Sequence, residues 1–407
     1  MNDSLLVSLL DTPVGVLTPT TRGRTQFSFL ESYREMVGRP VLGQWFEDNL
    51  VGPRVHRKRS LLPWFENMLA EGDLRKLLCK EHHIDESDDV RLLSALGRDL
   101  PGAVIIRSAQ EEVDFDPEGF VENDPVVVRE FADSRLKFSL AGVQLKLSMS
   151  RHEDRWTLPV HGVDGDWIAK IAWNDRYPGV ASNEYTTMQW ARRAGFDVPH
   201  CELSTLEHLD GVPSRRPAST PVFLIQRYDR TIGSRVHQED FAQVFGITPS
   251  QKYDHVTIER FGLLVRDLLG ESGLLEWLDR LLLTIATGNT DAHLKNWSLL
   301  YPDRIQPVWA PLYDQLCTLV YEVDDELALK FGGTDRFTDL DRSRFRWLAQ
   351  KLDAEESLLC RMDATLERLR EAWRNASSDL PISEAHREAL RSQWSRVPIL
   401  RDAGELP

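Results

Sequence analysis

Cysteine is scarce in this sequence, and its few cysteines form no recognisable framework. The 407 residues include four cysteines, which lie far apart and contain no CxxC pair: Cys79, Cys201, Cys317 and Cys360. His82 and His83 follow Cys79, but they are adjacent to each other and would project differently on a helix. Neither a disulfide scaffold nor a zinc site is therefore indicated.

Long apolar runs are also absent from the chain. No window approaches the roughly 18 uninterrupted apolar residues typical of a transmembrane helix. The first residues, MNDSLLVSLLDTPVG, contain acids and no basic segment, so they do not resemble a signal peptide. We therefore expect a cytoplasmic protein that makes no membrane contact and keeps its thiols reduced.

Basic residues are outnumbered by acidic ones. Lys and Arg number 49 and Asp and Glu number 64, which gives a formal net charge of −15. Such a field repels polyphosphate backbones and anionic membranes, so direct DNA binding by this chain alone is not expected. A local basic stretch, RVHRKR at 54–59, is interpreted as a solvated surface.

The chain contains no internal repeat, so changes of pattern indicate its organisation. Residues 1–105 begin with short strand patterns, continue with helical patterns and close with the strand-like PGAVII. Residues 106–235 predict about five strands interrupted by one helix over 183–195, which is the order of elements in a kinase small lobe. Residues 236–407 are mostly helical, and the segment 274–289 is apolar enough to predict a buried helix.

Polar chemistry is concentrated in GNTDAHLKNWSLLY, residues 288–301. A protein-kinase catalytic loop uses an Asp to accept the proton of the substrate hydroxyl and a following Asn to bind Mg²⁺. Asp291 and Asn296 have the DxxxxN spacing of that loop. WSLLY and QPVWA then predict two short strands that return a second Mg²⁺ ligand, Asp314, to the same cleft.

The same residues also permit a structural interpretation. Asp291 could cap a turn, Asn296 could fill another turn and Asp314 could be a surface acid. The DxxxxN pattern alone occurs often by chance. The paired strands and the second Asp after them favour the catalytic interpretation.

A kinase also requires a cation on the ATP phosphates. Lys170, in the strand pattern DWIAKIAW, lies where the third strand of a small lobe carries its phosphate-binding Lys. Glu184 follows near the start of the next helix, where it can pair with Lys170. Taken singly, Lys170 is also typical of a strand lysine that reaches solvent, and Glu184 of an acid that complements a helix dipole.

A GxGxxG phosphate loop is absent from the whole chain. SLAGVQLK at 139–146 contains a single glycine, Gly142, between two strand patterns. A glycine there would permit backbone N–H groups to approach an anion. A lone glycine between strands is equally typical of an ordinary hairpin.

Together these motifs resemble the HipA-type serine/threonine kinase toxins of bacterial toxin–antitoxin systems. SLAGVQLKLSM is similar to that family's phosphate loop, GNTDAHLKNWSLLY to its catalytic loop and APLYD to its metal-binding segment. HQEDFAQVFGI at 237–247, FLIQRYDR at 223–230 and LLPWFENMLAEGDLRKLL in the N-terminal block are also similar to family sequences. The similarity covers nearly the whole chain.

The resemblance implies a fold and its division. The fold is α+β, a bilobal protein-kinase-like structure with an extra N-terminal subdomain and a mostly helical C-terminal lobe. The expected domains are a HipA-type N-terminal subdomain at 1–105, a small lobe with the phosphate loop at 106–235 and a helical lobe at 236–407. The implied cofactors are ATP and Mg²⁺.

The resemblance also implies roles for individual residues. Asp291 would be the catalytic base, assisted by Lys170 on the phosphates, and Asn296 and Asp314 would bind Mg²⁺. The residues expected to contact the nucleotide are Ala141, Gly142, Val143, Gln144, Lys170, Glu184, Gln226, Tyr228, Gln238, His293 and Tyr313.

Ser139 falls on the family's autophosphorylation position, beside the phosphate loop. A phosphate there would add roughly −1.5 to −2 charges where the phosphates of ATP must bind, so the loop would leave its ATP-binding form. Ser139 could also be a turn serine. Likewise, Tyr228 and Tyr313 could be core aromatics and Gln238 a turn amide.

By the same resemblance, the chain transfers the γ-phosphate of ATP to a translation-related protein, such as an aminoacyl-tRNA synthetase, and to its own Ser139. A small helix-turn-helix antitoxin similar to HipB would neutralise it and connect it to DNA only indirectly. Two alternatives stay open: a catalytically silent subunit that binds the antitoxin, and a small-molecule kinase of related fold. The presence of Lys170, Asp291, Asn296 and Asp314 together favours an active enzyme.

Overall fold

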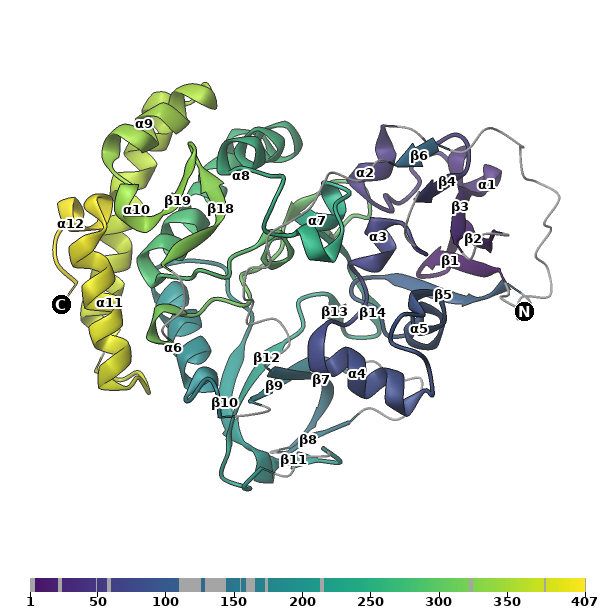
Figure 1. The fold of residues 1–407 in the computed structure, drawn as a ribbon, viewed down its shortest axis with the longest axis horizontal. Coiled ribbons are helices and arrows are strands. Elements are labelled where there is room, and N and C mark those ends of the chain that lie inside the picture. Colours follow the sequence, from purple (N-terminus) through teal and green to yellow (C-terminus); the bar gives the residue numbers. More distant parts are fainter. Residues whose placement is uncertain are drawn as a thin grey trace.

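The computed structural model contains three groups of elements (Figure 1). The N-terminal unit (described residues up to 109, and 126–128) lies on the right of the view, and the sheet unit (from 144 to 226) lies at the bottom. The helical unit (from 230 onward) lies at the centre and on the left. The described residues are 4–20, 24–48, 50–56, 60–109, 126–128, 144–153, 155–158, 165–172, 175–212, 216–321, 325–376 and 378–406.

The N-terminal unit is built on a six-stranded sheet of order β5-β1-β2-β3-β4-β6, in which only β4 and β6 pair in parallel. Its strands are β1 (Leu5–Leu9), β2 (Thr12–Pro19), β3 (Thr25–Phe29), β4 (Arg54–His56), β5 (Val104–Ser108) and β6 (Val126–Val128). Its helices are α1 (Glu31–Arg34), α2 (Gln44–Glu47), α3 (Pro63–Glu66), α4 (Gly72–Glu81) and α5 (Asp89–Leu96). The predicted strand and helix patterns of this block are therefore present.

Helix α4 connects the N-terminal unit to the next sheet. Leu74 and Leu77 pack against the buried cluster of the sheet unit, which includes Leu145. Cys79, on the same helix, belongs to the N-terminal core. One short helix thus contributes to two hydrophobic cores, so the two units are held together by apolar burial.

The sheet unit has the strand order β10-β12-β9-β7-β8-β11. Its strands are β7 (Gln144–His152), β8 (Arg155–Thr157), β9 (Trp167–Ala172), β10 (Cys201–Thr205), β11 (Leu209–Asp210) and β12 (Pro221–Gln226). Helix α6 (Val180–Arg193) packs against this sheet. It starts earlier than the predicted residue 183, and its additional residues Val180 and Ala181 are buried. The helix ends at Arg193, and Gly195 just beyond it has a φ of +84°, the left-handed conformation that is common after a helix.

The helical unit combines short hairpins with long helices. Its strands are β13 (Arg230–Thr231), β14 (Ser234–Arg235), β15 (His237–Asp240), β16 (Ser298–Tyr301), β17 (Val308–Trp309), β18 (Glu326–Phe331) and β19 (Thr334–Arg336). Its helices are α7 (Phe241–Val244), α8 (Ile258–Thr287), α9 (Arg342–Lys351), α10 (Glu355–Ala376), α11 (Glu384–Arg396) and α12 (Pro398–Ala403). The two strands predicted in WSLLY and QPVWA are β16 and β17, and they pair with each other.

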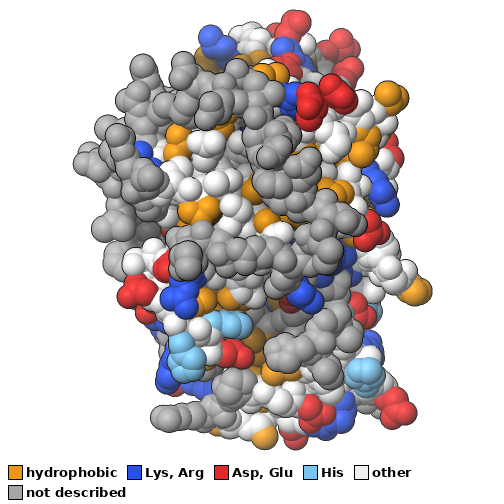
Figure 2. Space-filling view, turned by 90° about the vertical axis from the view of Figure 1, so that its right-hand side faces the viewer, with side chains coloured by type: hydrophobic (Ala, Val, Ile, Leu, Met, Phe, Trp, Pro, Cys, Tyr) orange, Lys and Arg blue, Asp and Glu red, His pale blue; other side chains and the backbone are white. Residues whose placement is uncertain are grey.

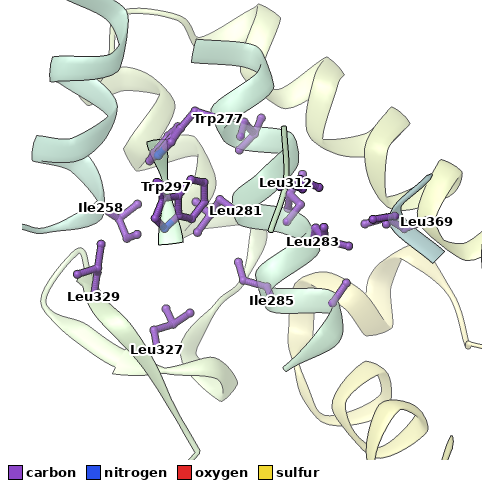
Figure 3. Close-up of a cluster of buried hydrophobic side chains, with 14 of the residues drawn as sticks. Ile258, Trp277, Leu281, Leu283, Ile285, Trp297, Leu312, Leu327, Leu329 and Leu369 are labelled. Carbon is purple, nitrogen blue, oxygen red and sulfur yellow. The ribbon is translucent and has the colours of Figure 1, made fainter. Parts of the chain in front are cut away.

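Helix α8 is longer than the apolar segment predicted at 274–289. It begins at Ile258 and is interrupted at Gly270, whose φ of 68° and ψ of −166° are not helical. Its second half is buried as predicted. Figure 3 shows Trp277 and Leu281 beside Trp297, with Leu327 of β18 nearby. Each fully buried side chain of this kind stabilises the fold by roughly 1.5–3 kcal/mol, so the helix is a rigid support for the loop that follows it.

The interpretation of 54–59 as a solvated surface is wrong for its described residues. Arg54 and His56 of β4 are 5% and 1% exposed. The Arg54 guanidinium lies over the rings of Trp45 and Phe46, each at 5.3 Å from the ring centroid, an arrangement that suits its planar cation. On the face of the molecule that Figure 2 shows, described acidic and basic side chains are interspersed rather than gathered by sign.

The four cysteines are all described and all free. Cys79, Cys201 and Cys317 are buried, and Cys360 is exposed. Across the described ranges, no group of three or more His, Cys, Asp or Glu could hold a metal ion. None of the described helices combines the length and the hydropathy that crossing a membrane requires.

A buried carboxylate joins the N-terminal unit to the helical unit. Glu239 of β15 accepts hydrogen bonds from the Gln44 N–H at 2.8 Å, the Trp64 Nε1–H at 3.0 Å and the Tyr301 hydroxyl at 2.5 Å. Burial raises the pKa of Glu239 to about 7, although the three hydrogen bonds act in the opposite direction. Above that pH the ionised carboxylate accepts from donors on both sides of the interface.

We therefore expect Glu239→Gln to lower the free energy of unfolding by about 1–3 kcal/mol at pH 8, because the new amide N–H would face donors that now bond an oxygen. Urea denaturation monitored by tryptophan fluorescence measures the difference. Glu31→Gln, at an exposed acid of the N-terminal unit, is the control and should change little. Equal stability of the Glu239 and Glu31 variants would contradict the bridging role.

Candidate active site

A single carboxylate, Asp314, connects the sheet unit to the helical unit. Its Oδ1 accepts a hydrogen bond from the ammonium of Lys170, which also donates to Glu184 of α6. Its Oδ2 accepts from Lys146 Nζ at 2.8 Å. Lys146 on β7 is the register partner of Lys170 on β9, so two neighbouring strands present two cations to one acid.

The charges in this cluster depend on one another. Lys170 and Glu184 are 3% and 1% exposed, and buried charges are costly unless they are paired. Burial by itself would lower the pKa of Lys170, but the Asp314 and Glu184 carboxylates outweigh burial and raise it. Burial would likewise raise the pKa of Asp314, but Lys146 and Lys170 hold it well below its usual range. Lys170 is therefore a cation and Asp314 an anion at neutral pH.

The backbone at Asp314 has an uncommon conformation. Its φ of 52° lies in the left-handed region, which few residues other than glycine adopt. Asn289 Nδ2 donates to its carbonyl at 3.4 Å, and Asn296 Nδ2 donates to its Oδ2 at 3.3 Å. Such conformations persist where the surroundings hold them, and they are frequent at functional sites.

The predicted catalytic loop follows the end of α8. Gly288, at φ 64°, ends the helix in the left-handed conformation. The Asn289 Oδ1 then accepts the N–H of Asp291 at 3.0 Å, and the N–H of His293 donates to the Asp291 carbonyl at 2.8 Å. The N–H of Asn296 donates to the His293 carbonyl at 2.9 Å. These three bonds join near neighbours, so they form the turns within the loop.

The carboxylate of Asp291 accepts a hydrogen bond from the hydroxyl of Tyr253. Burial raises the pKa of Asp291 to about 6, although the bond from Tyr253 lowers it. A carboxylate with such a pKa is ionised at neutral pH and basic enough to accept a proton. His293, whose ring lies 5.1 Å from that of Tyr253, is buried, and burial holds its pKa well below the usual value, so it is neutral.

Several predicted nucleotide contacts lie close together. The Tyr228 hydroxyl donates to Gln238 Oε1, and the rings of Tyr228 and Tyr313 lie 5.8 Å apart. The Tyr313 hydroxyl donates to the carbonyl of Lys295 in the catalytic loop at 2.9 Å. Gln226 ends β12 just before this group and is exposed. The group connects the end of the sheet unit to the catalytic loop.

The predicted phosphate loop is only partly described. Ser139, Ala141, Gly142 and Val143 lie outside the described residues, so their roles stay predictions. Gln144 begins β7, and its Nε2 is buried without a hydrogen-bond partner among the described residues. A buried amide donor without a partner is a group that a bound anion could satisfy.

The residues predicted to hold Mg²⁺ offer suitable oxygen atoms. Asn296 Oδ1 is buried and accepts no hydrogen bond from any described residue. The anionic carboxylate of Asp314 lies beside it. Mg²⁺ prefers oxygen ligands, keeps several waters and uses substrate phosphates, so one or two protein ligands are sufficient. The predicted pair therefore fits the ion.

Two residues that contact the predicted site residues were not themselves predicted as site residues from the sequence. Lys146 contacts Asp314, and it lies within the SLAGVQLK segment, where its strand alternation could have indicated it. Tyr253 contacts Asp291 from 38 residues earlier in the chain, and no local pattern indicates that contact. Only the packing of the segment before α8 against the catalytic loop brings the two together.

Two family models match consecutive parts of the chain. The model of the HipA-like C-terminal domain matches residues 138–376, and that of the HipA N-terminal domain matches residues 5–107. The chain belongs to the HipA family. The predicted domain boundaries near residues 105 and 235 stay predictions.

Similar proteins of comparable length support this assignment. The chain is 36% identical to Y4dM of Sinorhizobium fredii over 97% of each chain. It is 28% identical to Y4mE of the same organism over 91% of this chain and 95% of that protein. The serine/threonine-protein kinase toxin HipA of Shewanella oneidensis is 24% identical over 67% of this chain and 66% of that protein.

A solved HipA structure shares the fold. A chain in the complex of Shewanella oneidensis HipA, HipB and operator DNA matches with a TM-score of 0.72 at 18% identity, over 98% of this chain and 96% of that one. The predicted α+β, bilobal kinase-like fold with an added N-terminal subdomain is therefore confirmed.

The Asp291 carboxyl should titrate near pH 6 rather than near pH 4, because burial disfavours its charged form. Tyr253→Phe should raise the midpoint further, since it removes a hydrogen bond that stabilises the ionised form. Carbon-13 NMR of labelled aspartate, assigned with Asp291→Asn, measures both midpoints. A midpoint near 4, or one that does not move in the Tyr253 variant, would show that this environment is wrongly described.

Proposed function

We propose that this HipA-family protein is an ATP-dependent serine/threonine protein kinase. The observation that carries the proposal is the contact of Lys170, Glu184 and Asp314, because kinases require a strand Lys paired with a helix Glu near a metal-binding Asp. Asp291 lies in the loop that also supplies Asn296, as the reaction demands. The name of the Shewanella relative, a serine/threonine-protein kinase toxin, supports the same reaction.

In the proposed reaction, the acceptor hydroxyl oxygen forms a bond to the γ-phosphorus of ATP, and the bond from that phosphorus to the β–γ bridging oxygen breaks. ADP is the leaving group, and Asp291 accepts the hydroxyl proton. Tyr253 donates to Asp291 Oδ1, so the other carboxylate oxygen would be the one that faces the acceptor hydroxyl. Lys146 and Lys170 provide positive charge for the phosphates.

Asn296 and Asp314 would hold Mg²⁺, which neutralises negative charge on the phosphate oxygens when it is bound. The backbone around 141–144 would surround the phosphates, with the buried amide of Gln144 as a further donor. The remaining nucleotide contacts would come from Gln226, Tyr228, Gln238, His293 and Tyr313.

The proposed biological role is that of a toxin whose acceptor is a translation-related protein, for example an aminoacyl-tRNA synthetase. A small helix-turn-helix antitoxin similar to HipB would neutralise it, and DNA would be reached only through that partner. This part is supported by family membership and by the solved Shewanella complex that contains HipA, HipB and operator DNA.

Asp291→Ala should abolish phosphoryl transfer while Mg-ATP binding persists, because a general base contributes roughly 10²–10⁴-fold and most nucleotide contacts lie elsewhere. Labelling of the proteins of a bacterial lysate from γ-labelled ATP measures phosphoryl transfer, and calorimetry measures Mg-ATP binding. Undiminished transfer by the variant would remove Asp291 from the mechanism.

The same assay separates the two alternatives. A catalytically silent antitoxin-binding subunit would label no acceptor even as wild type. A small-molecule kinase would consume ATP with a panel of metabolites and leave proteins unlabelled.

Incubation with Mg-ATP should yield a singly phosphorylated and inactive protein, modified at Ser139. The added charge would repel the ATP phosphates from the adjoining loop. Ser139→Ala should stay active for longer. Peptide mapping by mass spectrometry locates the phosphate, and a Ser139-phosphorylated protein with full activity would contradict self-inactivation.

A further inference from the structure

We propose that Glu71, in the N-terminal unit, is a positioning residue for the catalytic loop; the inference rests on the proposed kinase function. Glu71 Oε1 accepts a hydrogen bond from Lys295 Nζ at 2.7 Å, and its Oε2 accepts one from Lys252 Nζ at 2.8 Å. One carboxylate thus holds two lysines of the helical unit, which lie 224 and 181 residues away in the sequence.

Glu71 does not act as an ordinary helix cap. It is the N-cap residue of α4, yet its side chain makes no capping hydrogen bond. An N-cap carboxylate would usually accept from the first N–H groups of its own helix. This one extends instead to the lysines, which hold its pKa well below the usual range against the effect of burial.

Loss of the Glu71 carboxylate would be costly for Lys252 and Lys295, because both side chains are nearly buried. The side chains of Lys252 and Lys295 are 6% and 14% exposed. Removing the carboxylate would leave two nearly buried cations without that counter-charge, and an uncompensated buried charge is strongly destabilising. We therefore expect the local backbone to move when Glu71 is neutralised.

Both lysines belong to segments that shape the catalytic loop. Lys295 lies within the loop, and its Nζ also donates to the carbonyl of Asn67 at 2.9 Å, so the N-terminal unit holds it twice. The carbonyl of Lys252 accepts the N–H of Leu294, another loop residue, at 3.3 Å.

The segment that contains Lys252 also contacts the proposed base, Asp291. Tyr253 directly follows Lys252, and its hydroxyl donates to the carboxylate of Asp291. Glu71 touches no reacting atom, so it acts through the residues that orient Asp291. A misplacement of about 1 Å in a catalytic group can cost about 10²-fold in rate. The N-terminal unit is therefore a working part of the proposed kinase site.

The test compares Glu71→Gln with the wild-type full chain. The initial rate of labelled phosphate incorporation into the chain itself should fall by about 10- to 100-fold at saturating Mg-ATP. The dissociation constant of Mg-ATP, measured by calorimetry, should change by a smaller factor than the rate, because most of the proposed nucleotide contacts lie outside the loop that Glu71 holds. Glu71→Asp keeps the charge on a shorter side chain and should give an intermediate rate.

Hydrogen exchange without nucleotide supplies an independent measurement. In Glu71→Gln, exchange should accelerate in peptides covering 289–297 and stay unchanged in the sheet unit. Asp99→Asn is the matched control: Asp99 also joins two cations across a unit boundary, Arg227 at 3.3 Å and Arg230 at 3.4 Å, but it does not contact the catalytic loop. That control should keep the wild-type rate and loop exchange.

Several outcomes would overturn the inference. The first is a wild-type rate of phosphate incorporation and wild-type loop exchange in Glu71→Gln. The second is faster exchange throughout the chain of that variant. The third is an equal loss of rate in Asp99→Asn. If the wild-type protein transfers no phosphate, the proposed function fails, and the exchange data alone still decide whether Glu71 holds the loop.

Discussion

Two carboxylates, Glu184 and Asp314, share the buried ammonium of Lys170, and this contact holds the sheet unit against the helical unit. The three charges are compatible with burial only as a set, because each alone would be costly away from water. Lys146 adds a second cation at Asp314. The result is a cluster of two cations and two carboxylates, which suits the proposed nucleotide and metal site.

The N-terminal unit contributes to the same region through acids that cross the interface in both directions. Glu239 of the helical unit accepts hydrogen bonds from Gln44 and Trp64, and Glu71 of the N-terminal unit accepts from Lys252 and Lys295. Hydrogen bonds of this kind are directional, so they restrict the relative orientation of the two units. The proposed catalytic loop is thereby also held by contacts from the N-terminal unit.

Sequence reasoning succeeded where structure depends on near neighbours. Within the 288–301 loop, bonds between residues two or three positions apart form the turns, and Gly288 ends the preceding helix in the left-handed conformation. The strand pairs β16–β17 follow from alternation and a turn. The helix predicted at 274–289 corresponds to the second of the two helical segments that meet at the non-helical Gly270. The burial of Arg54 was missed, because aromatic rings shield its guanidinium.

By itself, the sequence determined the motifs and the approximate order of the elements, since local spacing and periodicity encode both. The residues proposed for the chemistry came from those motifs and from the resemblance to the HipA family. Only the tertiary structure decided which side chains meet: Lys146 with Asp314 across 168 residues, Tyr253 with Asp291 across 38, and Glu71 with Lys295 across 224. The physical reason is that such contacts depend on strand register and on how three units pack. Many residues determine that packing jointly, and no short segment records it.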